Sequence, residues 1–157
     1  MPPWLSAFAA VLGVIVTAIG VFGWVGHQDD ARNPSPSPAP HIILDSVVVS
    51  DTEVTGNGRF TAIDPSLDRV LFLAGPKTET VGTTYSAVEA VLAPDNQAGD
   101  LKNGDWEAVR PATTGEALRY WAVLWPRSAG ATGNDDLRLH GPNSQFVIAA
   151  SEPYDAP

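Results

Sequence analysis

The chain has 157 residues and a formal net charge of −9, from 18 acidic and 9 basic side chains, and it contains no cysteine. The lack of cysteine excludes a disulfide framework, a thiolate zinc site and a cysteine nucleophile. A nucleic-acid-binding domain needs a cationic surface that displaces counterions from phosphate, and this sequence has no basic cluster. We therefore expect no nucleic-acid partner, and a length that allows one folded domain with an appendage.

The segment 4–25 is predicted to be a transmembrane helix. It runs from Trp4 to Val25 without a charged residue. At a rise of ~1.5 Å per residue it is about 33 Å long, which matches a bilayer core of roughly 30 Å. Trp4 and Trp24 fall at its two ends, where interfacial aromatic residues lie. Membrane lipid is therefore the expected partner of residues 4–25.

A cleaved signal peptide is the alternative interpretation of this segment. Its N-terminal flank lacks Lys and Arg, its apolar run exceeds the usual length of about 7–15 residues, and no Ala-x-Ala site follows. We therefore expect an uncleaved anchor in the cell membrane. Asp29 and Asp30, followed by an acidic domain, favour a cytoplasmic N-terminus and an extracytoplasmic domain.

Small residues recur along one face of the predicted helix, at alternating spacings of four and three: Ser6, Ala10, Gly13, Thr17 and Gly20. Small side chains let transmembrane helices approach closely, so this small-residue stripe predicts a homodimer or a partner helix. The alternative is that glycine and alanine, which are frequent in such helices, fall on one face by chance.

Residues 26–40 are predicted to be a proline-rich linker. From Asn33 to Pro40 proline alternates with small residues, which favours an extended polyproline II conformation. At ~3.1 Å per residue this stretch spans about 25 Å and acts as a semi-rigid spacer.

Residues 41–153 are predicted to form the folded domain, and 154–157 a short tail. Segments rich in branched and aromatic residues alternate with Gly, Pro, Asn and Asp, without an amphipathic helix between them. The predicted strands are 42–49, 53–60, 70–74, 85–93, 105–109, 119–125 and 145–150. Their spacing predicts an all-β fold, an Ig-like antiparallel β-sandwich of about seven strands, preceded by one N-terminal transmembrane helix.

Three short sequences indicate how these strands are connected. Gly56-Asn57-Gly58 is typical of either a tight hairpin turn or a strand with a bulge. Asn103-Gly104 predicts a turn. A single helical turn is expected from Asp135 to His140, with Asp at its start and Gly141-Pro142 at its end.

Five segments together resemble a small β-sandwich module of bacterial, especially actinobacterial, membrane-anchored proteins: Gly56–Phe60, Val70–Pro76, Gly104–Ala108, Tyr120–Trp125 and Gly141–Ser151. The resemblance covers most of residues 42–152. It implies an extracytoplasmic accessory or sensing domain. The shared features are structural rather than catalytic, so the resemblance implies no functional residues.

No catalytic, cofactor-binding or metal site is predicted. Asp135, Asp136 and His140 have a helical spacing that would bring them to one face, as a metal or acid–base set. A capped helical turn in a solvated loop explains the same residues, and it is the interpretation that we expect.

Aromatic residues are the better candidates for contact with a ligand or partner. Trp121, Val123 and Trp125 share one face of the predicted strand 119–125. If exposed, Trp121 and Trp125 would lie about 13 Å apart and form a stripe able to stack on sugar rings or bind a protein. If buried, they would belong to the core, as we expect for Trp106.

We therefore expect a membrane-anchored, non-enzymatic, extracytoplasmic domain with a binding, sensing or accessory role, and a protein or envelope glycan as its partner. One alternative is a cell-envelope hydrolase that uses the region of Asp135 and His140. Another is a purely structural membrane subunit that works through the small-residue stripe.

Overall fold

The computed structural model describes residues 37–78, 82–113 and 118–156. The predicted transmembrane helix, its small-residue stripe and linker residues 26–36 lie outside these ranges. Within the described part of the chain, no helix combines the length and apolar character needed to cross a membrane. The compact unit that contains the described residues begins at Pro38.

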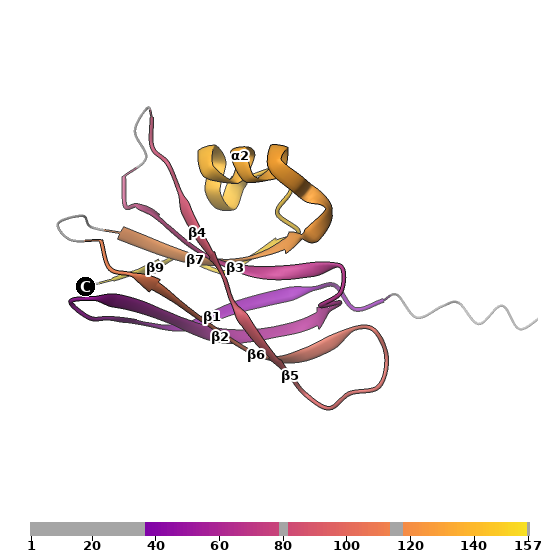
Figure 1. Cartoon of the computed structure of the whole chain (residues 1–157). Helices are drawn as coiled ribbons and strands as arrows, with labels where there is room; N and C mark the ends of the chain where they lie inside the picture. Colours follow the sequence, from indigo (N-terminus) through magenta and orange to yellow (C-terminus); the bar gives the residue numbers. More distant parts are fainter. Residues whose placement is uncertain (1–36, 79–81, 114–117, 157) are drawn as a thin grey trace, which may run out of the picture. The chain divides into compact units, whose positions relative to one another are not determined.

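The described residues form two antiparallel β-sheets and one α-helix (Figure 1). The elements are β1 (His41–Val49), β2 (Glu53–Ile63), β3 (Asp68–Pro76), β4 (Ser86–Glu89), β5 (Val91–Pro94), β6 (Lys102–Pro111), β7 (Leu118–Pro126), α2 (Gly130–His140), β8 (Ala149–Ala150) and β9 (Tyr154–Asp155). The first sheet has the strand order β1-β2-β6-β5, and the second has the order β4-β3-β7-β8, with β9 also paired to β7. The predicted all-β antiparallel fold is confirmed.

The main core lies between the two sheets. Phe72 of β3 stacks on Tyr120 of β7, with ring centroids 5.4 Å apart, and also contacts Trp106 of the first sheet at 6.1 Å. β3 and β7 are the inner strands of the second sheet, and they are apolar on both faces because the first sheet packs on one face and α2 with the segment after it packs on the other. This central position agrees with the prediction for 70–74 and 119–125.

The outer face of the second sheet is covered by α2 and the segment after it. Leu137 of α2 packs with Trp121, Val123 and Trp125 in a second buried cluster, and Phe146 lies 5.9 Å from the Trp125 ring. The predicted single helical turn was too short, because the helix begins at Gly130 rather than at Asp135. Packing against the sheet stabilises the added turns, although their sequence carries no capping side chain. The predicted end is confirmed: the helix stops before Gly141, whose φ is 53°.

The predicted strand 85–93 is two strands in different sheets. β4 pairs with β3 in the second sheet, and β5 pairs with β6 in the first. The chain crosses between the sheets at Ala90, whose amide donates to the Val70 carbonyl at 2.9 Å. Val88, Ala90 and Leu92 all face the core across this crossing, so the alternation of the sequence continues and gives no local signal of the change.

Asn103-Gly104 lies inside β6 and is not a turn. The register between β2 and β6 shifts between Phe60 and Ile63, and the Ala62 amide at this bulge donates to the Asn103 side chain at 2.9 Å. A Cβ on Gly104 would lie 2.3 Å from the Ala93 carbonyl oxygen. The Asn-Gly pair therefore serves a bulge and a close strand approach, two roles that use the same residue types as a turn.

The C-terminal strand is shorter and later than predicted. Of residues 145–150, only Ala149 and Ala150 form a strand, and pairing with β7 resumes at Tyr154 and Asp155, in the segment expected to be a tail. Two hydrogen bonds from Arg119 to the Asp155 carboxylate, at 2.8 and 3.0 Å, hold this last strand.

Candidate functional site

The two sheets differ in what covers their outer faces. α2 lies on the second sheet (Figure 1), whereas no helix or strand among residues 37–78, 82–113 and 118–156 covers the first. Alternate residues of β2 and β6 point outward there, including Arg59, Asp105 and Glu107, which are exposed. The outer face of the first sheet is therefore the surface of this unit that is open to a partner.

A β-bulge shapes this face. In the pairing of β1 with β2, Leu44 is opposite Gly58 and Ser46 is opposite Asn57, so Asp45 is an extra residue without a pairing partner. The bulge directs the Asp45 carboxylate toward Arg59, which donates two hydrogen bonds of 2.9 Å to it. This pairing lowers the pKa of Asp45 and raises that of Arg59. Both groups thus stay ionised, and the guanidinium is fixed in place.

Gly58 is required by the way β1 approaches β2 at the bulge. A Cβ on Gly58 would lie 1.9 Å from the carbonyl oxygen of Ile43. That oxygen accepts a hydrogen bond of 3.0 Å from Nε1 of the buried Trp106. The indole of β6 thereby satisfies a carbonyl of β1 across the intervening strand, and this explains the glycine inside β2.

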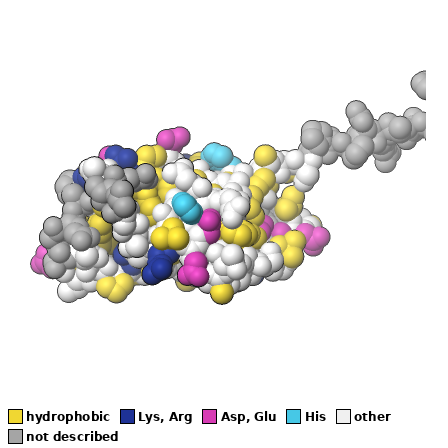
Figure 2. All heavy atoms as spheres, turned by 90° about the horizontal axis from the view of Figure 1, so that it is seen from above, with side chains coloured by type: hydrophobic (Ala, Val, Ile, Leu, Met, Phe, Trp, Pro, Cys, Tyr) yellow, Lys and Arg dark blue, Asp and Glu magenta, His cyan; other side chains and the backbone are white. Residues whose placement is uncertain are grey.

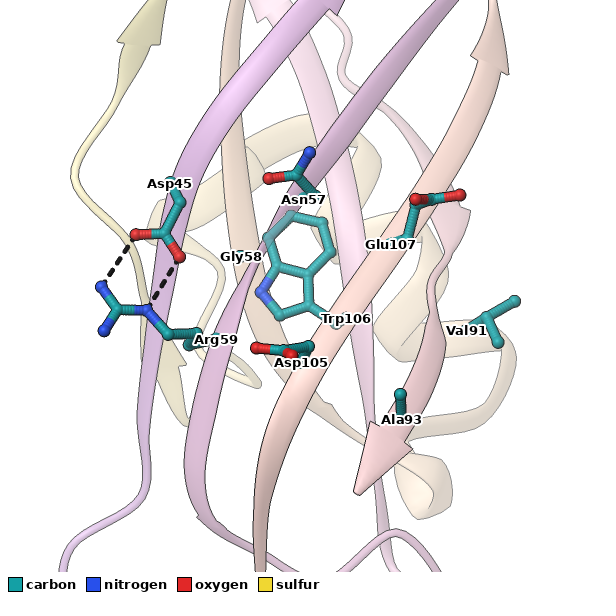
Figure 3. A pocket seen from close by; sticks show the side chains of 9 residues that line it. All are labelled: Asp45, Asn57, Gly58, Arg59, Val91, Ala93, Asp105, Trp106 and Glu107. Atoms are coloured by element: carbon teal, nitrogen blue, oxygen red, sulfur yellow. Dashed lines mark hydrogen bonds and ion pairs between the residues drawn. The ribbon is translucent and has the colours of Figure 1, made fainter. Parts of the chain in front are cut away.

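A groove of about 560 Å³ lies over this part of the sheet (Figure 3). Its lining residues come from β1, β2, β5 and β6: Asp45, Asn57, Gly58, Arg59, Val91, Ala93, Asp105, Trp106 and Glu107. Val91, 76% exposed, and Ala93 form an apolar side, and the charged side chains and Asn57 lie around Trp106. The groove therefore offers both apolar and charged side chains to a ligand.

The groove has an excess of negative charge. It contains three carboxylates and one guanidinium, and the guanidinium is already paired with Asp45. Asp105 and Glu107 form no ion pair with the described residues, although Asp105 is close enough to Arg59 to contribute to the raised pKa of that arginine. Two carboxylates are therefore available to basic groups of a partner.

Trp121 and Trp125 do not form an exposed stripe. Trp121 is 8% exposed and Trp125 is fully buried beneath α2 and Phe146. Tyr85 packs edge-on against Trp121 at 5.7 Å. Both tryptophans therefore belong to the core, which was the second of the two possibilities left open by the sequence.

The Asp135, Asp136 and His140 set is only partly assembled. Asp136, rather than Asp135, approaches His140, with the Nε2 to Oδ1 distance at 3.7 Å. Ser144 Oγ donates to the other oxygen of Asp136, and the Gln145 amide donates to the same oxygen at 3.2 Å. Asp136 thus anchors the segment that follows α2. Among the described residues no group of three metal-binding side chains occurs.

The sequence analysis did not identify the groove residues, because alternating polar residues occur on the exposed face of most strands. Period-two alternation in β2 and β6 places Asn57 and Arg59 on the same face as Asp105 and Glu107, once the two strands are known to be neighbours. Neither the neighbouring position of the two strands nor the bulge at Asp45 follows from local sequence.

Comparisons with known proteins give no relative for this chain. A scan against protein-family models, a search of curated proteins and a search of solved structures each found no match.

Proposed function

We propose that this chain is a membrane-anchored, extracytoplasmic and non-enzymatic module that binds a protein partner through the outer face of its first sheet. The observation that carries the proposal is the asymmetry of the sandwich: α2 covers one outer face, and a groove of about 560 Å³ lies on the other. The uncharged segment 4–25 is proposed to be the anchor, and the proline-rich residues 26–40 the spacer.

We further propose that the sandwich is Ig-like. The strand order β1-β2-β6-β5 corresponds to the A-B-E-D sheet of immunoglobulin domains. The order β3-β7-β8 corresponds to C-F-G, with β4 added at the edge. The chain has no cysteine and so lacks the inter-sheet disulfide of antibody domains. Phe72, which stacks on Tyr120 and contacts Trp106 of β6, fills the core between the two sheets.

The chemistry of the groove favours a protein over a glycan as partner. Sugar rings stack on exposed aromatic faces, but the one aromatic residue of the groove, Trp106, is 2% exposed. Asp105 and Glu107 instead provide carboxylates for Lys or Arg, and Val91 provides an apolar contact. The proposed partner therefore presents basic and aliphatic side chains.

Photo-crosslinking in the native membrane tests this proposal. A photoreactive phenylalanine analogue at Asn57, in the groove, should yield a discrete adduct with one protein. The same analogue at Leu139, 54% exposed on α2, should not yield that adduct. Identical adducts from both positions, or none from Asn57, would contradict a partner on the first sheet.

Charge reversal supplies the matched control. The double substitution Asp105→Lys and Glu107→Lys should abolish the Asn57 adduct, because it places positive charge opposite the basic groups of the partner. Asp95→Lys with Asp100→Lys makes the same charge change in the exposed segment between β5 and β6, and should leave the adduct intact.

A further inference from the structure

A second cleft, of about 380 Å³, lies between α2 and the edge of the second sheet. Its apolar floor and wall consist of Leu71, Ala87, Tyr85 and Leu137. The Tyr85 amide donates to the Arg138 carbonyl at 2.8 Å, which joins the residue before β4 to the last turn of α2. This hydrogen bond holds together the two sides of the cleft, α2 and the edge of the second sheet.

The charged residues that line the cleft carry more positive than negative charge, because Arg69 and Arg138 outnumber Glu89. Glu89 is shared between two guanidiniums, at 3.3 Å from Arg69 and 3.2 Å from Arg127. The Glu89 carboxylate therefore neutralises only one of the two guanidinium charges that it contacts. The Nε of Arg69 is buried and has no hydrogen-bond partner among the described residues.

A third guanidinium, that of Arg138, lines the cleft from α2 and forms no ion pair with the described residues. The charged residues that line the cleft therefore carry one net positive charge, from Arg69 and Arg138 against Glu89, in a chain whose net charge is −9. Figure 2 views the molecule from the α2 side and shows Lys or Arg side chains beside hydrophobic ones on this face.

We propose that this cleft binds a small organic anion, whose carboxylate or phosphate group is held by Arg69 and Arg138. Guanidinium groups offer paired donors that match both kinds of anion. The apolar body of the ligand would lie on Leu71 and Leu137, between the sheet and the helix. This site is separate from the groove of the first sheet and does not depend on it.

NMR titration of the full chain in phosphatidylcholine nanodiscs tests the proposal. The probes are benzoate and phenyl phosphate, with neutral benzamide and inorganic phosphate for comparison. We expect saturable shifts at the amides of Ala87, Leu137 and Arg138 with the two aryl anions, and affinities about tenfold lower or less for benzamide. If benzamide binds as tightly as the aryl anions, the arginines do not contribute to binding and the proposal fails. If inorganic phosphate binds as tightly as phenyl phosphate, the apolar residues do not contribute and the proposal fails.

Variants with opposite expected signs separate binding from loss of fold. Arg138→Gln and Arg69→Gln should each weaken phenyl phosphate binding about tenfold. Glu89→Gln should tighten it, because Arg69 and Arg127 lose the carboxylate that competes for them. Lys102→Gln, the same charge change as Arg138→Gln but on the first sheet, should have no effect. Unchanged affinity in both arginine variants, or weaker binding in Glu89→Gln, would overturn the assignment.

Discussion

At the scale of single residues, the indole of Trp106 connects strands that are not neighbours. It belongs to β6, yet its Nε1 donates to the Ile43 carbonyl of β1, across Gly58 of β2. Trp125 is equally buried, but its Nε1 has no hydrogen-bond partner among the described residues. The two tryptophans can therefore be compared directly: both are buried, but only the Trp106 indole donates a hydrogen bond.

Two single variants, Trp106→Phe and Trp125→Phe, together measure how much the hydrogen bond from Trp106 to the Ile43 carbonyl contributes to stability. Trp106→Phe should lower the free energy of unfolding by about 0.5–1.5 kcal/mol more than Trp125→Phe, because only the first substitution removes a hydrogen bond, the one to the Ile43 carbonyl. Chemical denaturation of each variant measures the difference. Equal losses would mean that packing alone accounts for Trp106.

Residue types also explain the errors in the predicted turns. Asn and Gly serve hairpin turns because they tolerate unusual backbone angles and form local hydrogen bonds. Asn103 instead accepts from the Ala62 amide, and Gly104 makes room for the Ala93 carbonyl. The same chemistry serves turn and bulge, and only the neighbouring strand distinguishes the two.

At the scale of elements, the crossing from β4 to β5 ties the two sheets together. Ser86 at the start of β4 receives a hydrogen bond of 2.7 Å from Arg110 of the first sheet. Four residues later the chain leaves the second sheet at Ala90. Since β4 and β5 pair with different sheets, this segment resists sliding of one sheet over the other.

The attachment of β9 should depend on pH. Hydrogen bonds from Arg119 hold the pKa of Asp155 below its usual value of 3.8. The folded state therefore releases this proton more readily than the unfolded state, so the stabilisation is complete above pH 3.8 and is lost as the pH falls through the lower folded pKa. Arg119→Gln should remove that part of the stability.

Melting temperatures measured from neutral pH to acid pH test the expectation. The gap between the native chain and Arg119→Gln should narrow as the pH falls below 3.8. Arg138→Gln removes a guanidinium that forms no ion pair with the described residues. The difference in melting temperature between the native chain and this variant should therefore stay constant over the same pH range. A gap for Arg119→Gln that is independent of pH would contradict the assigned role of Asp155.

At the scale of the whole molecule, the small-residue stripe of segment 4–25 predicts self-association. Gly13→Leu with Gly20→Leu should abolish a cross-linked dimer in membranes, because larger side chains prevent close approach of the helices. Val14→Leu with Val21→Leu places the same side chains at the same spacing off the stripe, and should leave the dimer intact. If both pairs behave alike, the stripe has no role in association.

The fold class and the main strands could be predicted from local sequence patterns. Branched residues define β1, and continuous apolar runs define β3 and β7, because strand propensity and periodicity are local properties. The end of α2 at Gly141 was equally local, since it depends on the backbone freedom of one residue.

Which surface is open depends on contacts between distant parts of the chain and could not be predicted. β7 is apolar on both faces, so its sequence cannot say whether Trp121 and Trp125 meet the opposite sheet, a helix or a partner. The helix that covers them has few apolar residues and forms through packing on the sheet. The groove likewise exists because β1, β2, β5 and β6 lie side by side, and strand order is set by contacts between residues far apart in the chain.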